Sequence, residues 1–221
     1  MPSATDRPFS IVVLISGNGS NLQAIIDAIH GEELPARIVA VISNRADAFG
    51  LQRAQQANIP TEVIAATGIR SRDDYDSHLM ACIDRYEPDL IVLAGFMRIL
   101  SDRFVQHYLA RMINIHPSLL PAYKGLDTHR RVLAAAEKEH GATVHYVTPE
   151  LDSGPIIVQA RIPVAENETE AELAQRVHQL EHKIYPYAVG LIAEGRLRLE
   201  HQTVMLDGKP ISPADVQFRL N

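Results

Sequence analysis

Short apolar runs alternate with longer amphipathic segments along most of the chain. The apolar runs are rich in β-branched residues, which is typical of strands that are covered on both faces of a sheet. They predict strands at residues 11–15, 38–42, 61–65, 90–93, 141–147 and 156–163, and a further strand that ends at His116. Between these runs apolar residues recur with helical spacing, which predicts helices at residues 22–29, 48–57, 71–86, 128–139 and 169–191, and another after Ser101.

Strands that are separated by helices favour parallel β-α-β units. We therefore expect an α/β fold with a doubly wound, mostly parallel sheet, followed by a short C-terminal hairpin that turns at Asp207-Gly208. No internal repeat, low-complexity segment or linker divides the sequence. One domain is expected over residues 1–221.

Composition narrows the class of protein. Of 221 residues, 46% are apolar and 22% are charged, as in ordinary globular proteins, and the net charge is −6 without a block of lysines or arginines. A nucleic-acid backbone is therefore not an expected partner. Cys82 is the only cysteine, which excludes an internal disulfide and fits a reducing cytosol. With no apolar run near the ~20 residues of a membrane span, a cytoplasmic protein is expected.

The first candidate site is the stretch Asn114-Ile115-His116-Pro117, with Pro121 four residues further on. Two residues apart on an extended backbone, Asn114 and His116 point to the same face, and Pro117 favours an extended conformation for His116. Catalytic groups of open α/β sheets gather beyond the carboxyl ends of the strands. An amide donor and a titratable imidazole can hold and protonate an oxyanion there. The alternative is a turn in which His116 only ends the strand.

A glycine-rich loop, residues 16–21, separates the first strand from the first helix. Bare backbone N–H groups at a helix N-terminus suit an anion, and Ser20 and Asn21 add side-chain donors. The dinucleotide pattern is not met, because Leu22 stands where its third glycine belongs and no acidic residue follows the second strand. A monophosphate therefore fits better than a dinucleotide or a triphosphate. A plain strand-to-helix turn is the alternative.

Two further segments belong to the same predicted rim. Residues 97–100 follow the strand at 90–93, and they offer an apolar wall with one guanidinium beside the expected position of His116. Asp152 lies in a loop before Gly154-Pro155, where it either forms the turn or orients the imidazole of His116 and keeps it charged.

The last helix carries the pattern His178-x-x-Glu181-His182, which matches an inverted zinc-protease signature. Such a site would need a third ligand from farther along, for example Glu194 or Glu200. The other interpretation, which we favour, is a solvated flank of an amphipathic helix, because Leu180 between the two histidines belongs to the buried stripe.

Taken together, four segments resemble the phosphoribosylglycinamide formyltransferases, the folate-dependent transformylases of purine synthesis. They are residues 15–23, 93–100, 114–121 and 141–155, and they occur in the order of that family over about residues 10–190. The segment 114–121 alone is less specific, since other enzymes that use formyltetrahydrofolate share it. The resemblance implies a Rossmann-like formyltransferase fold, small-molecule substrates, no metal, and a monomer or weak homodimer.

The resemblance also implies residue roles. Asn114, His116 and Asp152 would be the catalytic trio, and Gly19, Ser20, Asn21 and Glu181 would bind glycinamide ribonucleotide. The implied folate-binding residues are Arg72, Met97, Arg98, Ile99, Leu100, Asn114, Thr148, Pro149, Glu150, Leu151 and Asp152. Two departures concern loops: Pro149 stands where many relatives carry an acidic residue, and Asp127 lies in a segment that varies.

The implied reaction is formyl transfer from 10-formyltetrahydrofolate to the ribonucleotide's amine. Asn114 and protonated His116 would stabilise the oxyanion, and Asp152 would keep His116 charged. The rival hypotheses are a tRNA formyltransferase, a formyltetrahydrofolate deformylase, a zinc peptidase built on His178, Glu181 and His182, and a non-catalytic phosphosugar sensor. The first two are disfavoured, because their families carry additional domains for which this sequence has no room.

Overall fold

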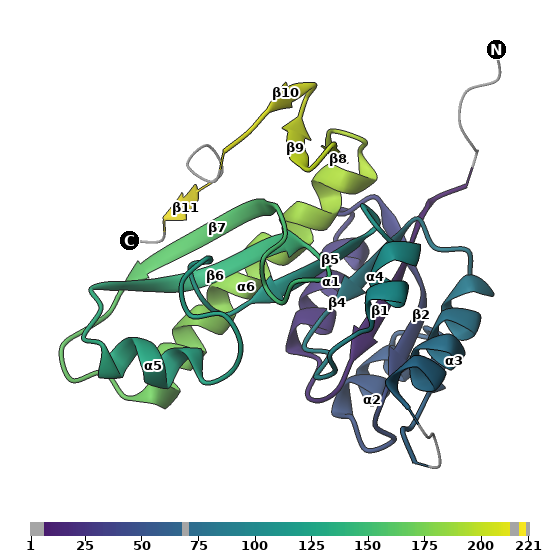
Figure 1. Cartoon of the computed structure of the whole chain (residues 1–221), viewed down its shortest axis with the longest axis horizontal. Coiled ribbons are helices and arrows are strands. Elements are labelled where there is room, and N and C mark those ends of the chain that lie inside the picture. The colour runs from purple at the N-terminus through teal and green to yellow at the C-terminus, as the bar shows by residue number, and fades with distance from the viewer. Residues whose placement is uncertain (1–6, 68–70, 213–216, 220–221) are drawn as a thin grey trace.

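The computed structural model describes residues 7–67, 71–212 and 217–219. Within these residues eight strands form one sheet in the order β11-β7-β6-β5-β4-β1-β2-β3, and three form a small second sheet in the order β10-β9-β8 (Figure 1). The strands are β1 Phe9–Ile15, β2 Ala36–Ser43, β3 Thr61–Val63, β4 Leu90–Leu93, β5 Met112–His116, β6 Glu139–Tyr146, β7 Ile156–Pro163, β8 Leu197–Glu200, β9 Thr203–Leu206, β10 Lys209–Pro210 and β11 Gln217–Arg219. The helices are α1 Ser20–His30, α2 Phe49–Gln56, α3 Arg72–Asp84, α4 Asp102–His107, α5 Thr128–Ala134 and α6 Glu170–Ala193.

The predicted doubly wound, mostly parallel sheet is confirmed. Strands β3, β2, β1, β4 and β5 are parallel to one another, whereas β6 is antiparallel to both β5 and β7. The chain winds outward in one direction through β2 and β3 and then in the other direction through β4 and β5. The switch between β1 and β4 is the place where open α/β sheets bind ligands, outside the carboxyl ends of the strands.

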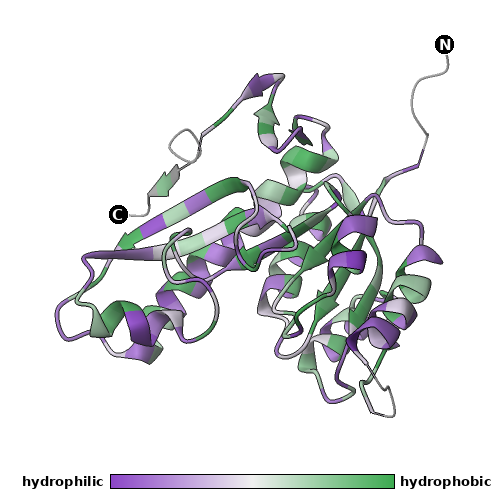
Figure 2. Ribbon diagram, viewed as in Figure 1, coloured by the Kyte–Doolittle hydropathy of each residue, from purple (hydrophilic) through white to green (hydrophobic). Residues whose placement is uncertain are grey.

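Both faces of the sheet are covered, and β1 shows how the sequence achieves this. Successive side chains of a strand point to opposite faces, so Ile11, Val13 and Ile15 join a core beneath α1 and α6, while Val12 and Leu14 join a second core beneath α3 and α4. All five are fully buried. In Figure 2 the strands of the parallel half are mostly coloured as hydrophobic, whereas α3 shows many hydrophilic positions.

Several helix ends follow the predicted chemistry. The Ser101 side chain accepts a hydrogen bond from the Phe104 N–H, so the predicted N-cap is confirmed. Thr169 and Glu172 form a capping box at the start of α6. That helix continues through Pro186. A proline inside a helix is expected to bend it, and the bend stays a prediction.

One helix is shorter than predicted. α5 ends at Ala134, not near residue 139, because Ala136 takes a positive φ of 51° and β6 already begins at Glu139, opposite Pro163 of β7. The predicted C-terminal hairpin is confirmed as an antiparallel unit, in which β8 pairs with β9 through a turn at residues 201–202 and the predicted turn at Asp207-Gly208 joins β9 to β10. Leu197 and Val204 of this unit are buried against the core of the main sheet. Among the described residues no helix is both long and apolar enough to cross a membrane.

Candidate active site

His116 is the last residue of β5, as the Asn-x-His-Pro pattern predicted, and its imidazole lies against Asp152. The Nδ1 atom is 3.5 Å from Oδ2 of Asp152, and both side chains are only 8% exposed. The Nε2 atom is 3.0 Å from the carbonyl oxygen of Tyr123. A carboxylate and a carbonyl can only accept, so both ring nitrogens have partners only in the protonated imidazole. The imidazole of His116 therefore lies between two acceptors.

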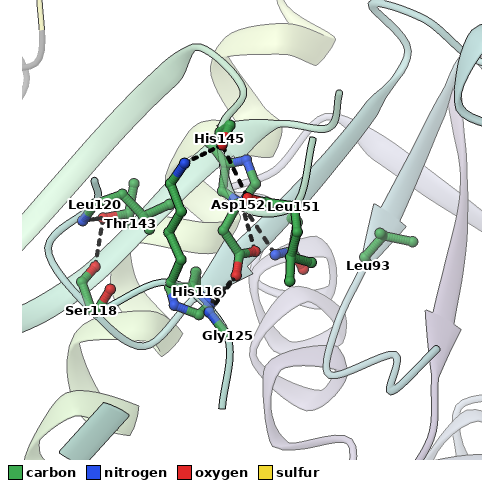
Figure 3. Close-up of polar contacts among 12 residues, drawn as sticks. Leu93, His116, Ser118, Leu120, Gly125, Thr143, His145, Leu151 and Asp152 are labelled. Atoms are coloured by element: carbon green, nitrogen blue, oxygen red, sulfur yellow. Dashed lines mark hydrogen bonds and ion pairs between the residues drawn. The ribbon is translucent and has the colours of Figure 1, made fainter. Parts of the chain in front are cut away.

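Asp152 is held in an unusual backbone conformation. Its φ is +49°, in the left-handed region that Asp tolerates better than most residues. Its Oδ2 atom lies against Nδ1 of His116 and also accepts a hydrogen bond of 2.9 Å from the Gly125 N–H. Figure 3 shows Asp152 between His116 and His145. The sequence left open whether Asp152 only forms a turn, and the geometry places its carboxylate at the imidazole.

His145 was not predicted from the sequence, and it determines how Asn114 is oriented. The two residues are partners in the antiparallel pair of β5 and β6. Nδ1 of His145 lies 2.9 Å from the carbonyl oxygen of Tyr146 and must donate to it, so Nε2 of the neutral ring accepts from Nδ2 of Asn114 at 3.2 Å. Burial lowers the pKa of His145 and favours this neutral form. One Nδ2–H of Asn114 is thereby fixed, and the other remains for a ligand.

The turn after His116 is held by a buried polar network, which the sequence also did not reveal. The Thr143 hydroxyl donates to the carbonyl of Ser118 and accepts from the Leu120 N–H (Figure 3). Gln159 donates to the carbonyl of Leu120. Thr143, Ser118 and Gln159 are at most 2% exposed. Because buried polar groups are costly without partners, this network fixes the path of the chain as it leaves β5.

The predicted phosphate loop lies at the switch point. Gly19 has a φ of +73°, and a Cβ there would lie 2.7 Å from the Cα of Gly50, so the loop needs glycine at this position. The first turn of α1 has no side-chain cap and no acidic residue, which leaves its N–H groups for an anion. Arg53 of α2, missed in the sequence, binds the carbonyl and side-chain oxygens of Asn18 at 2.9 and 3.1 Å and adds positive charge.

Glu181 of α6 reaches the same loop. Its carboxylate is 3% exposed and accepts a hydrogen bond of 2.8 Å from Nδ2 of Asn21. Burial raises the pKa of Glu181, while the bond to Asn21 opposes that change. The structure thus brings Glu181 together with the predicted phosphate-binding residues.

The histidines of the H-x-x-E-H pattern do not join Glu181 in a ligand cluster. His178 is exposed on the flank of α6, and the described part of the chain contains no group of three or more His, Cys, Asp and Glu side chains arranged to hold a metal. A cavity of about 840 Å³ runs from Ser20 and Arg53 past His182 between α1 and α6. None of Asn114, His116 and Asp152 lines it.

Exposed apolar side chains occur after β4 and in the loops that contain Gly125 and Asp152. The exposed fraction is 69% for Met97, 66% for Ile99 and 54% for Leu151. Leu126, which was not predicted from the sequence, is 75% exposed. Such side chains at the carboxyl rim of a sheet suit a flat, partly apolar ligand. The Met97 N–H donates to the Ser16 hydroxyl at 2.7 Å, so this wall is tied directly to the phosphate loop.

The other predicted folate-pocket residues differ in how they are placed. Arg98 stacks on Tyr75 of α3, with its guanidinium carbon 3.7 Å from the ring centroid, and Leu100 packs against the core beneath α3 and α4. Thr148 donates to the carbonyl of Glu150 within the loop that also contains Pro149. Arg72 is exposed in the first turn of α3, and none of its described contacts joins it to the catalytic residues.

The sequence pattern of the formyl transferase family matches residues 9–189. The chain belongs to this family. The phosphoribosylglycinamide formyltransferase of Escherichia coli is 53% identical to it over 92% of this chain and 96% of the relative, and that of Haemophilus influenzae is 45% identical over 91% and 95%. The assignment as a formyltransferase from its sequence motifs is therefore confirmed.

Solved structures support the same conclusion. The phosphoribosylglycinamide formyltransferase of Coxiella burnetii superposes on this formyltransferase with a TM-score of 0.92 and 57% identity, over 96% of this chain and all of the other. A glycinamide ribonucleotide transformylase of Symbiobacterium toebii gives a TM-score of 0.88 at 43% identity, over 91% and 95%. A formyltetrahydrofolate deformylase of Pseudomonas syringae is 24% identical with a TM-score of 0.84, which shows a shared fold only.

Proposed function

We propose that this formyltransferase, as one domain over residues 1–221, transfers the formyl group of 10-formyltetrahydrofolate to the amine of 5-phosphoribosylglycinamide in cytoplasmic purine biosynthesis. The observation that carries the proposal is the convergence of Asn114, His116 and Asp152 at the rim of the sheet, beside a phosphate loop at the switch point. The name of the similar Escherichia coli protein supports the same substrate.

The ribonucleotide's phosphate would bind at the N-terminus of α1. The backbone N–H groups of Gly19, Ser20 and Asn21 would donate to the phosphate there, and the helix dipole favours negative charge. Glu181 is already bonded to Asn21 and would accept from a polar group of the ribonucleotide. Fixing the phosphate and the sugar places the amine toward the end of β5, so that attack becomes effectively intramolecular.

The amine would attack the formyl carbon, and the formyl oxygen would take on negative charge. The free Nδ2–H of Asn114, aimed by His145, would donate to this oxygen, and protonated His116 would stabilise it and supply a proton. The carboxylate of Asp152 would hold the imidazolium and help carry the amine proton to the leaving nitrogen of the folate. The bond between the formyl carbon and that nitrogen would then break, the C=O bond would re-form, and the oxygen would return its proton to His116. No step in this scheme draws on a metal.

The folate would lie against the exposed apolar wall of Met97, Ile99 and Leu151, with Arg98, Leu100, Asn114 and the loop of residues 148–152 completing its pocket. Arg72, exposed at the start of α3, would contribute from the outer edge.

The product's identity tests the proposal. Purified protein is incubated with 10-formyltetrahydrofolate and 5-phosphoribosylglycinamide, and the ribonucleotide is examined by mass spectrometry for one added formyl group. We expect formylated ribonucleotide and tetrahydrofolate in equal amounts. Free formate without formylated ribonucleotide would identify a deformylase instead, and ribonucleotide binding without any turnover would leave only a sensor.

A further inference from the structure

The residues from Tyr123 to Gly125, here called the 123–125 segment, contact both members of the catalytic pair through backbone atoms. The carbonyl of Tyr123 accepts from Nε2 of His116 at 3.0 Å. The N–H of Gly125 donates to Oδ2 of Asp152 at 2.9 Å. The orientation of the imidazole and that of the carboxylate therefore both depend on where this segment lies.

The segment does not keep this position through backbone preference. Tyr123 and Gly125 have φ values of 57° and 80°, and Asp127 just beyond them has 57°. The left-handed region is disfavoured for Tyr, so contacts with surrounding groups must help to hold the segment in place. Two such contacts lie on its outer side: the Tyr123 hydroxyl donates to Glu137 at 2.7 Å, and the guanidinium of Arg131 donates to the carbonyl of Lys124 at 2.7 Å.

The contact toward the catalytic side comes from Lys124. Its ammonium group lies 3.2 Å from Oε1 of Glu150 and donates to the hydroxyl of Ser153, which itself donates to the carbonyl of Leu151. Glu150 and Ser153 stand on either side of Asp152 in the chain. The Lys124 side chain is 36% exposed and Glu150 is 78% exposed, so the ion pair alone contributes little to folding. Its importance lies in what it aligns.

We propose that Lys124 is a positioning residue, whose ammonium group fastens the 123–125 segment to the loop around Asp152 and so keeps the carboxylate and the Tyr123 carbonyl on the imidazole of His116. Lys124 touches neither ring nitrogen and acts through Asp152 and the segment's backbone. This inference rests on the proposed formyl transfer and names a residue that the sequence motifs did not include.

The test compares Lys124→Met with Lys209→Met, which removes the same charge from an exposed position in the small second sheet. We expect kcat to fall about tenfold in Lys124→Met, less than the ~10²-fold cost of a full 1 Å misplacement, while KM for the ribonucleotide stays within about twofold. Lys124→Arg should restore most of kcat, and Lys209→Met should match the unaltered protein. Thermal unfolding of each variant verifies that it is folded.

Hydrogen exchange gives a second readout that does not require turnover. The Gly125 amide, which donates to Asp152, should exchange faster in Lys124→Met and at the normal rate in Lys209→Met. An unchanged kcat together with unchanged Gly125 exchange would overturn the inference, as would a change confined to KM, which would mean a substrate contact. If the proposed function itself were wrong, ribonucleotide-dependent turnover would be absent in the unaltered protein, whereas Gly125 exchange would still report on Lys124.

Discussion

His116 and His145 lie on neighbouring strands, and their ring nitrogens face different partners. Both nitrogens of His116 face acceptors, the carboxylate of Asp152 and the carbonyl of Tyr123. Nδ1 of His145 faces the carbonyl of Tyr146, its Nε2 faces the amide of Asn114 and, at 3.8 Å, Oδ1 of Asp152, and the ring is buried. We therefore expect His116 to act on the substrate and His145 to aim the amide of Asn114.

This division of roles predicts that His145 acts through Asn114. Asn114→Ala should lower kcat by about 10²–10³-fold, the usual cost of losing an oxyanion donor, and His145→Ala should lower it by less. In the double variant, the loss should be close to that of Asn114→Ala alone, because His145 has no amide left to orient. Steady-state kinetics of the four proteins measure this. Two losses that multiply would show that His145 contributes independently of Asn114.

The contact between α5 and β6 contains a histidine pair, in which His140 is buried and His129 is half-buried. Nδ1 of His129 is 3.0 Å from Nε2 of His140, and burial lowers the pKa of both, that of His140 to about 4. Between about pH 6.5 and 4 the unfolded chain therefore binds more protons than the folded one. The stability contributed by neutral His140 is complete above about pH 6.5 and is lost as the pH falls toward 4.

We accordingly expect His140→Gln to be less sensitive to acid than the unaltered protein. Neutral His140 accounts for on the order of 3 kcal/mol of the stability lost on acidification, and the variant should not lose that part. Urea unfolding at pH 7 and pH 4.5 measures the difference for each protein. An equal loss in both proteins would mean that His140 does not titrate as its burial requires.

The whole molecule places two ligand regions at one edge of the sheet. The predicted phosphate loop follows β1, the apolar wall follows β4 and His116 ends β5, so parallel pairing brings these three together. Asp152 joins them from the loop between β6 and β7, through the antiparallel pairing of β5 with β6. The bond from the Met97 N–H to the Ser16 hydroxyl connects the loop to the wall. A ligand that binds the folded loop should therefore stabilise the entire domain.

That stabilisation can be measured with the ribonucleotide. At 100 times its Kd, the ligand adds about 2.7 kcal/mol, which raises Tm by roughly 5–10 °C for a chain of this size. Gly19→Ala should abolish most of this rise, because its φ is +73° and the new Cβ would meet Gly50. Gly190→Ala is the matched control, since a Cβ there meets only Leu34 at an ordinary distance of 3.5 Å. A full rise in Gly19→Ala would place the phosphate elsewhere.

The parts that could be predicted from the sequence follow from local rules. β-Branched runs such as 90–93 predicted strands, Pro117 fixed the end of β5, and Ser101 was recognised as an N-cap because its effect reaches only three residues. The alternation of strands and helices then predicted parallel pairing and hence which strand ends share a rim.

The rest depends on pairing between distant segments. That His145 meets Asn114 follows from the antiparallel register of β5 and β6, which no local pattern specifies. Lys124 reaches the loop around Asp152 only because the chain after Pro121 turns back in left-handed conformations. The folate-pocket role of Arg72 was implied by resemblance alone and stays a prediction.

We propose that Asn114, His116 and Asp152 carry out formyl transfer to the ribonucleotide. The most direct test follows deformylation of the folate by absorbance, with and without 5-phosphoribosylglycinamide, in the unaltered protein and in His116→Ala. We expect turnover that requires the ribonucleotide and that falls by about 10²-fold or more in His116→Ala. That variant should still show the ribonucleotide-dependent rise in Tm. Turnover that persists in His116→Ala, or that does not need the ribonucleotide, would contradict it.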